Sequence, residues 1–142
     1  MTLLDAYAVV ALLGDEPAAP EVEAILRAGE AGITVVNLAE AIDVTSRVHR
    51  IPQEEVREAL APLLGDAIVV VIQDEAASWR AAALRQTHYD RRFSALSVAD
   101  SLLIAAVHEG DELATADPVV ARVARIEGHR VAALPDSTGE RP

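Results

Sequence analysis

Residues 112–118 read Glu-Leu-Ala-Thr-Ala-Asp-Pro, a short apolar run that ends in an acid and a proline. The run predicts a strand over 112–115. Asp117 before Pro118 predicts the start of a helix, because Asp is a preferred N-cap and Pro suits the first helical turn. The same pattern opens the chain, where an apolar run ends at Asp5. Strands that give way directly to helices are typical of a parallel α/β sheet.

The rest of the chain repeats this alternation. Short apolar runs, several rich in Val and Ile, predict five strands: 2–5, 31–36, 67–72, 112–115 and 130–134. Longer segments with helical spacing lie between them: 6–13, 20–28, 38–48, 53–63, 75–88, 98–108 and 118–127. We therefore expect an α/β fold, a mostly parallel five-stranded sheet with helices on both faces.

Length and composition narrow the function classes. The 142 residues suffice for one domain, expected over 1–134, and the polar segment 135–142 is expected to fray. There is no Cys and all 12 basic residues are Arg, which excludes disulfides, thiolate metal sites and catalytic lysines. A net charge of −11 disfavours broad attraction to nucleic acid, so a polyanionic substrate would need a local basic surface.

The same features bear on localisation. The absence of Cys favours the cytoplasm, and the first residues lack the basic n-region of a signal peptide. No apolar run approaches the roughly 18 residues of a membrane-spanning helix, so no membrane association is expected.

Four acids stand where strands give way to helices: Asp5, Glu40, Asp100 and Asp117. In a parallel sheet these junctions meet at the carboxyl ends of the strands, so the acids should converge. Asp100 is reached through the loop 88–97, which must return to that edge. Carboxylates held together repel one another, and the repulsion implies a bound cation or raised pKa values.

Each acid also has a purely structural reading as a helix cap. Asp5 and Asp117 suit the N-cap position, while the sequences Asn37 to Glu40 and Ser97 to Asp100 resemble capping boxes. For any single acid the cap is the stronger reading. The conjunction of four acids favours a site instead, because random capping would mix acids with Ser, Thr and Asn at both ends of the sheet.

An all-oxygen site without His or Cys suits a hard cation such as Mg²⁺, with Mn²⁺ as the alternative. The four histidines show no ligand spacing. Such a cation supports phosphoryl chemistry. Thr115 and Ser101 flank the candidate site and could hydrogen-bond a water on the metal, although a cap or helix-surface role is an equally good reading. Arg91 and Arg92 form part of the densest basic patch and could contact substrate phosphates, although a salt-bridged surface strip is an equally good reading.

With these residues in place, the sequence resembles the PIN-domain ribonucleases, and among them the toxins of VapBC toxin–antitoxin pairs. The resemblance runs from Met1 to about Leu134. It rests on four motifs in order: Leu3-Leu4-Asp5-Ala6, Asn37-Leu38-Ala39-Glu40, Ser97-Val98-Ala99-Asp100-Ser101-Leu102-Leu103-Ile104-Ala105 and Leu113-Ala114-Thr115-Ala116-Asp117. The chain departs from the family pattern at Tyr7, where a small hydroxyl or amide residue is usual, and after Asp117, where Pro118 replaces a basic residue.

The resemblance implies a three-layer α/β/α sandwich and assigns Asp5, Glu40, Asp100 and Asp117 to an acidic quartet that binds Mg²⁺ or Mn²⁺ and hydrolyses RNA. It also implies a homodimer and a cognate antitoxin. The leading hypothesis is therefore a metal-dependent endoribonuclease toxin. One alternative is a non-catalytic binding module whose acids only cap helices. Another is an aspartate-nucleophile phosphatase. That chemistry requires a second acid at position 7, which is Tyr7 here, and a lysine, which the chain lacks.

Overall fold

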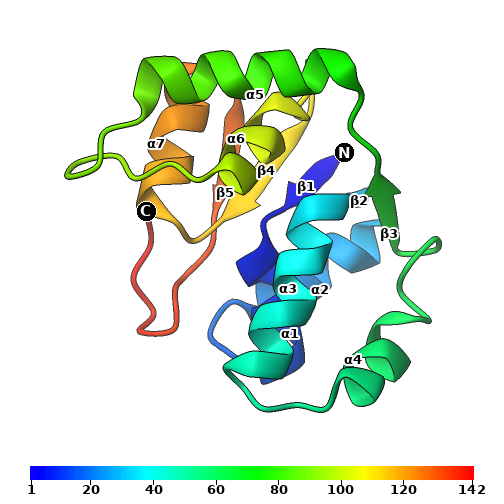
Figure 1. Cartoon of the computed structure of the whole chain (residues 1–142). Coiled ribbons are helices and arrows are strands. Elements are labelled where there is room, and N and C mark those ends of the chain that lie inside the picture. Colours follow the sequence, from blue (N-terminus) through cyan, green and yellow to red (C-terminus); the bar gives the residue numbers. More distant parts are fainter.

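Five parallel strands form the centre of the structure, a computed structural model that describes residues 1–142 (Figure 1). The strands are β1 (Thr2–Leu4), β2 (Ala31–Thr34), β3 (Ile68–Val71), β4 (Glu112–Thr115) and β5 (Arg130–Ala133). They lie in the order β3-β2-β1-β4-β5, and every neighbouring pair is parallel. The predicted mostly parallel five-stranded sheet is confirmed.

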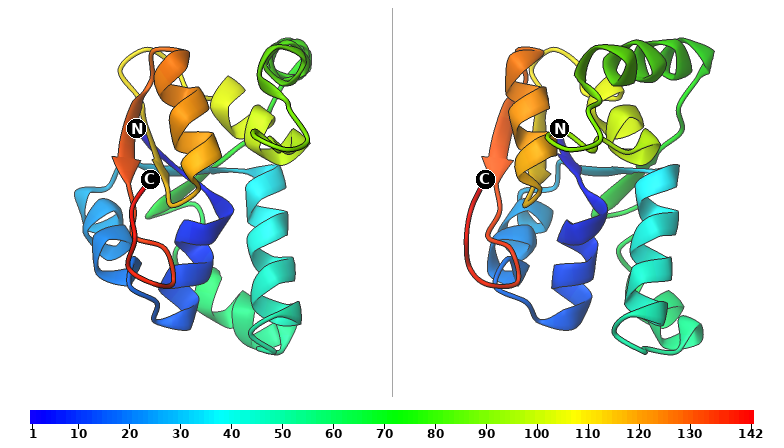
Figure 2. Two further views of the ribbon diagram at one scale, coloured as in Figure 1. Left: turned by 90° about the vertical axis from the view of Figure 1, so that its left-hand side faces the viewer. Right: turned by 60° about the vertical axis from the view of Figure 1, so that its left-hand side comes forward.

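Seven helices cover the two faces of this sheet. They are α1 (Ala6–Gly14), α2 (Ala19–Ala28), α3 (Val35–Arg47), α4 (Gln53–Leu60), α5 (Glu75–His88), α6 (Val98–Ala105) and α7 (Pro118–Ile126). Figure 2 shows α1 to α4 on one side and α5 to α7 on the other. The three-layer α/β/α arrangement is therefore confirmed.

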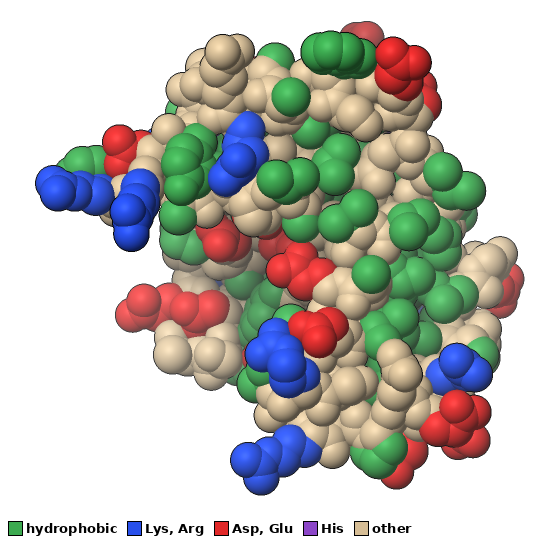
Figure 3. All heavy atoms as spheres, viewed as in Figure 1, with side chains coloured by type: hydrophobic (Ala, Val, Ile, Leu, Met, Phe, Trp, Pro, Cys, Tyr) green, Lys and Arg blue, Asp and Glu red, His purple; other side chains and the backbone are tan.

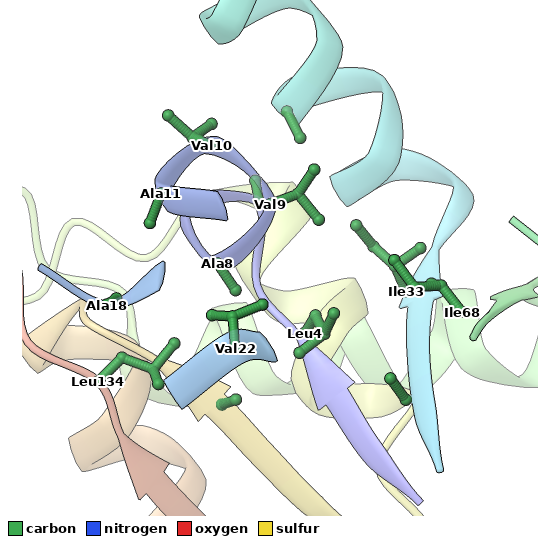
Figure 4. Packing of buried hydrophobic residues seen from close by; sticks show 14 of the residues in the cluster. Leu4, Ala8, Val9, Val10, Ala11, Ala18, Val22, Ile33, Ile68 and Leu134 are labelled. Atoms are coloured by element: carbon green, nitrogen blue, oxygen red, sulfur yellow. The ribbon is translucent and has the colours of Figure 1, made fainter. Parts of the chain in front are cut away.

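Alternation along the strands produces two separate cores. Successive side chains of a strand point to opposite faces. Leu4 accordingly packs in the core under α1, α2 and α3, while its neighbour Leu3 packs against α6 and α7. Figure 4 shows Leu4 beside Val22 of α2 and Ala8 of α1 in the first core. Full burial of a Leu side chain contributes about 1.5–3 kcal/mol, so both faces hold the helices firmly.

The strand order places a binding crevice at one point of the sheet. Going from β3 to β1 the order runs backwards along the chain, and it reverses between β1 and β4. Ligands bind outside the carboxyl ends of the strands at such a switch point. The Asp5 amide donates to the Ala114 carbonyl at 3.0 Å, which ties the end of β1 to β4. The residues that follow these two strands therefore share one location.

Three predicted boundaries are wrong by three residues. The helices expected over 53–63 and 98–108 end at Leu60 and Ala105, and the start of the helix after β2 is also misplaced. The strand expected over 31–36 ends at Thr34, and α3 begins at Val35 rather than at residue 38. The Thr34 hydroxyl caps the helix by accepting from the Asn37 amide at 3.1 Å. The expected capping box at Asn37 does not form, because Thr34 takes the N-cap position and Glu40 falls in the second turn.

The segment 135–142 forms no helix or strand. A turn is organised by Asp136, whose carboxylate accepts from the Thr138 amide at 2.8 Å. Arg141 binds Glu21 of α2 with both terminal nitrogens. The expectation that this tail frays stays a prediction, now with a defined attachment to test.

None of the helices combines the length and the apolar character needed to cross a membrane.

Candidate active site

Asp5 is the buried centre of the site. It follows β1 directly and is the N-cap of α1, and only 7% of its surface is exposed. One carboxylate oxygen accepts from the Ala6 amide at 2.6 Å, and the other accepts from the Thr115 hydroxyl at 2.6 Å. Thr115 in turn accepts from the Asp117 amide at 3.0 Å. The carboxylate is thus fixed from both sides of the β1–β4 junction.

Asp117 follows β4 and caps α7. Its Oδ1 accepts from the amides of Val119 at 2.6 Å and Val120 at 3.1 Å, and Pro118 occupies the first helical turn as predicted. Its Oδ2 has no protein partner, and the side chain is exposed. Capping therefore uses one oxygen of this carboxylate and leaves the other free.

Asp100 lies in the first turn of α6, within a capping box. Its Oδ2 accepts from the Ser97 amide at 2.8 Å, while the Ser97 hydroxyl accepts from the Asp100 amide at 3.0 Å. The predicted capping box at this position is confirmed. The other carboxylate oxygen again has no protein partner.

Glu40 differs from the other three acids, because it caps nothing. It lies in the second turn of α3, is exposed, and makes no hydrogen bond or ion pair with the protein. Asp43, one turn further on, is held by Arg47 in a two-pronged ion pair. The structural reading as a cap therefore fails for Glu40.

These four acids line one hollow of about 210 Å³ at the carboxyl ends of β1 and β4. Its other lining residues are Ala6, Tyr7, Val10 and Val44, so no basic side chain enters it. Figure 3 shows acidic side chains gathered in the middle of the face where α3 and α6 meet. Larger hollows beside α5 are lined by at most one acid, Glu127. The sequence expectation that the quartet converges is supported by this shared lining.

The electrostatics of the hollow follow from burial and like charge. Burial is the main cause that raises the pKa of Asp5 to about 6, and the negative charges of Asp100 and Asp117 add to it, against the lowering effect of the Thr115 hydroxyl. The pKa of Glu40 is also raised, first by the partial loss of solvent around its carboxylate and then by the charges of Asp100 and Asp43. The protein itself supplies no counter-charge to these groups.

The donor set fits a hard cation bound partly through water. No three Asp, Glu or His side chains are grouped closely enough to enclose a metal ion by themselves. Mg²⁺ does not require such a cage, since it keeps several waters and takes one or two carboxylates directly. The free oxygens of Asp100, Asp117 and Glu40, beside the buried Asp5, match this mode of binding.

The remaining predicted site residues lie elsewhere. Thr115 is fully buried beneath Asp5 and gives its only hydroxyl proton to that carboxylate. Arg91 and Arg92 are exposed on the loop between α5 and α6 and do not line the hollow. No measurement of activity bears on these roles, so they stay predictions.

Tyr7 is a lining residue that sequence reasoning noted only as a departure from the family pattern. Tyr7 lines the hollow, and its hydroxyl donates to Glu16 at 2.8 Å. Burial and the Glu16 carboxylate raise its pKa above the ordinary value, so the phenol stays protonated. The helical spacing of Tyr7 and Val10, two and five residues after Asp5, is the signal that could have revealed this wall.

Comparisons with known proteins agree with this geometry. The family model described as "PIN domain" matches residues 2–126. None of the curated proteins matches the sequence. Among the solved structures that share the fold, three are each no more than 20% identical to this chain. A toxin–antitoxin complex from Klebsiella pneumoniae is 19% identical with a TM-score of 0.58, over 82% of this chain and 87% of that chain.

FitAcB from Neisseria gonorrhoeae is 20% identical with a TM-score of 0.64. VapBC2 from Rickettsia felis, bound to a DNA fragment from its promoter, is 17% identical with a TM-score of 0.60. Both similarities cover 92% of this chain and 96% of the other. At these identities the neighbours support the fold alone.

Proposed function

Because the chain belongs to the PIN domain family, matched over residues 2–126, we propose that it is a metal-dependent endoribonuclease toxin. PIN domains are generally nucleases, so phosphodiester hydrolysis is the reaction class from which the proposal starts. RNA as the substrate and Mg²⁺ or Mn²⁺ as the cofactor are the finer parts of the proposal. They rest on the chemistry of the hollow.

One observation carries the proposal: four carboxylates line a single hollow that contains no basic residue. Such a site attracts a cation and repels a bare phosphate, so a substrate phosphodiester needs a cation between itself and the acids. A divalent cation bound there would polarise the phosphate and lower the pKa of an attacking water.

Each acid has a distinct role in this proposal. Asp5, Asp100 and Asp117 hold the cation directly or through water, and their backbone hydrogen bonds orient them. Glu40 has no competing partner and either completes the ligand set or orients the attacking water. Thr115 is a positioning residue, because it fixes Asp5 and touches no solvent.

A cognate antitoxin is the proposed partner. Two of the structural neighbours are described as a toxin–antitoxin complex and a VapBC2 complex, and all three share this fold. A basic side chain of such a partner would neutralise the acids of the hollow and displace the cation. We also propose a homodimer and a cytoplasmic location. The homodimer is testable by light scattering of the purified chain.

The test of the proposed activity is RNA cleavage. Purified protein free of any partner is incubated with total cellular RNA in Mg²⁺, in Mn²⁺ and in EDTA, beside Asp5→Asn. We expect discrete products that require the cation and disappear in the variant. The absence of cleavage with either cation would contradict the proposal, and equal cleavage by Asp5→Asn would remove the hollow as its site.

A non-catalytic binding module is the second candidate, because three of the four acids do cap helices. The two candidates differ in their response to cations. A cation bound to the native state raises its stability by about 2.7 kcal/mol at a hundredfold excess over Kd, whereas capping acids give no such specific effect.

A further inference from the structure

The loop between α5 and α6 exposes an aromatic side chain next to two arginines. Phe93 is the only Phe of the chain, and 82% of its surface is exposed. Arg91 and Arg92 precede it, are also exposed, and pair with no acid. In Figure 1 this loop projects from the side of the molecule, and Figure 3 shows basic side chains at that edge.

The tip of this loop has a defined conformation. Asp90 and Ser94 exchange two backbone hydrogen bonds, each of 2.9 Å, and so close a tight hairpin around the three tip residues. The Asp90 carboxylate accepts from the amides of Arg92 at 2.8 Å and Phe93 at 3.0 Å. Ordering these residues in advance lowers the entropy lost when they bind a partner.

The base of the loop is anchored to the protein. Ser94 and Leu96 are buried. Arg85 of α5 donates to the Leu96 carbonyl at 3.0 Å, and Arg122 of α7 donates to the Ser94 hydroxyl at 2.8 Å. Arg85 and Arg122 both hold the base of the loop in place. The side chains of the tip residues Arg91, Arg92 and Phe93 make no hydrogen bond or ion pair that stabilises the protein.

We propose that this loop tip, Arg91 to Phe93, binds unpaired nucleotides of the RNA substrate. The Phe93 ring stacks on one base, and the two guanidinium groups contact neighbouring phosphates. This inference deepens the proposed function and rests on it. An exposed base can stack on an aromatic ring only when it is not paired in a duplex, so the loop selects single-stranded segments.

Charge and position favour RNA over a protein partner. The chain carries a net charge of −11, but at this tip two neighbouring unpaired arginines outnumber the single Asp90 carboxylate, so the local charge is positive. The loop leads directly into α6, and Asp100 is the seventh residue after Phe93. Even a fully extended chain of that length spans only about 25 Å, so one RNA strand can reach both the tip and the hollow.

Direct binding of RNA tests the inference without relying on cleavage. The background is Asp5→Asn in EDTA, and the probe is a labelled mixed-sequence single-stranded oligoribonucleotide, with the same sequence in a hairpin stem for comparison. We expect Phe93→Ala to weaken binding of the single strand about tenfold or more. Arg91→Ala with Arg92→Ala should lower the slope of log K against log salt by about 1.4.

Matched control variants distinguish these effects from the general effect of removing an exposed aromatic ring or positive charge from the surface. Trp79 is also an exposed aromatic residue, at 71%, and lies on α5. Arg27 and Arg57 are exposed arginines on α2 and α4. Trp79→Ala and the pair Arg27→Ala with Arg57→Ala should leave the affinity unchanged within twofold. Asp90→Ala keeps Arg91, Arg92 and Phe93 but removes the two carboxylate hydrogen bonds to the tip amides, and it should also weaken binding.

The outcomes of binding and cleavage are independent. Unchanged affinity in the loop variants, or equal losses in the controls, would overturn the inference and leave the loop as a contact for protein. Equal affinity for the stem would overturn the selection of unpaired bases. If the loop variants lose binding but the unmodified protein cleaves no RNA, the binding site stands and the proposed catalysis falls.

Discussion

Carboxylates behave in two opposite ways in this molecule. On the outer faces of α2 and α3 they are paired, as in Glu21 with Arg141 and Asp43 with Arg47. In the hollow at the switch point four carboxylates have no basic partner. The hydrogen bond from Arg141 lowers the pKa of Glu21, whereas burial raises that of Asp5. Arginines neutralise these two surface acids, whereas the hollow has no basic residue and its charge is left for an external cation.

The largest expected effect comes from removing one acid of the hollow. Asp100→Asn keeps the cap, since the amide oxygen can still accept from Ser97, but it removes one negative charge from the proposed cation site. Loss of several kcal/mol of transition-state stabilisation lowers the cleavage rate by about a thousandfold. The measurement is kcat/KM on a defined RNA at saturating Mg²⁺.

The matched control for this variant is Asp43→Asn. Asp43 is an acid on α3, one turn from Glu40, but it is held in an ion pair outside the hollow. Its replacement should change the rate less than threefold. Equal losses of kcat/KM in the two variants would contradict the claim that the acids of the hollow differ from the paired acids of the surface.

The stability of Asp5→Asn tests the raised pKa of the buried acid. The native pKa of Asp5, about 6, lies above the ordinary value of 3.8. Between these pH values the native state binds more protons than the unfolded chain, so the free energy of unfolding falls as pH rises through this window. Above pH 6 the ionisation of Asp5 has lowered the free energy of unfolding by at most about 3 kcal/mol.

Asp5→Asn removes this cost, although its amide fits the Thr115 hydroxyl less well. We expect the variant to be more stable than the unmodified protein by about 1–2 kcal/mol at pH 8 and equally stable near pH 4. Urea unfolding at both pH values, in EDTA, provides the comparison. A variant that is less stable at pH 8 would show that Asp5 is satisfied by the protein.

A smaller effect is expected at Thr115, which links Asp5 to Asp117. Thr115→Val removes a donor to Asp5 and leaves the part-buried Asp117 amide without its acceptor, at a cost of about 1–3 kcal/mol. Since the hydroxyl lowers the pKa of Asp5, its loss raises that pKa. The acid limb of the activity profile should move to higher pH. Thr115→Ser should restore both properties, and failure of this rescue would argue against the positioning role.

The smallest effect is expected on the paired side of the comparison. Arg141→Ala breaks the ion pair with Glu21, whose side chains are 49% and 43% exposed. Exposed pairs contribute little, so the Tm should fall by no more than about 2 °C. Deletion of residues 135–142 should behave in the same way. A much larger loss would show that the tail is part of the domain.

The strands and two of the acids, Asp5 and Asp117, were predictable because their signals are local. The apolar run before Asp5 and the Asp117-Pro118 pair each specify a strand end and a cap within a few residues. The start of α3 was missed because Val35-Val36 continues a β-branched run, which favours a strand, while the Thr34 hydroxyl stops it. The convergence of Asp100 depends on the path of a loop, which only the family resemblance supplied.

Other features depend on contacts between distant segments and leave no local pattern. The Phe93 loop is ordered by Asp90 but anchored by Arg122, which lies 28 residues away from Ser94. The bond between Arg141 and Glu21 spans 120 residues. Neither contact has a fixed spacing or period in the sequence, so composition alone predicts only that the segments are polar.

A cation titration of the unmodified protein tests the central claim most directly. The Tm is measured against Mg²⁺ and Mn²⁺ at pH 8 and pH 5, with NaCl at matched ionic strength. We predict a rise of about 8 °C at pH 8 at a hundredfold excess over Kd. The rise should be smaller at pH 5, where protons compete for Asp5, and absent in Asp5→Asn with Asp100→Asn. No rise at pH 8, or an equal rise in the double variant, would contradict a cation site in the hollow.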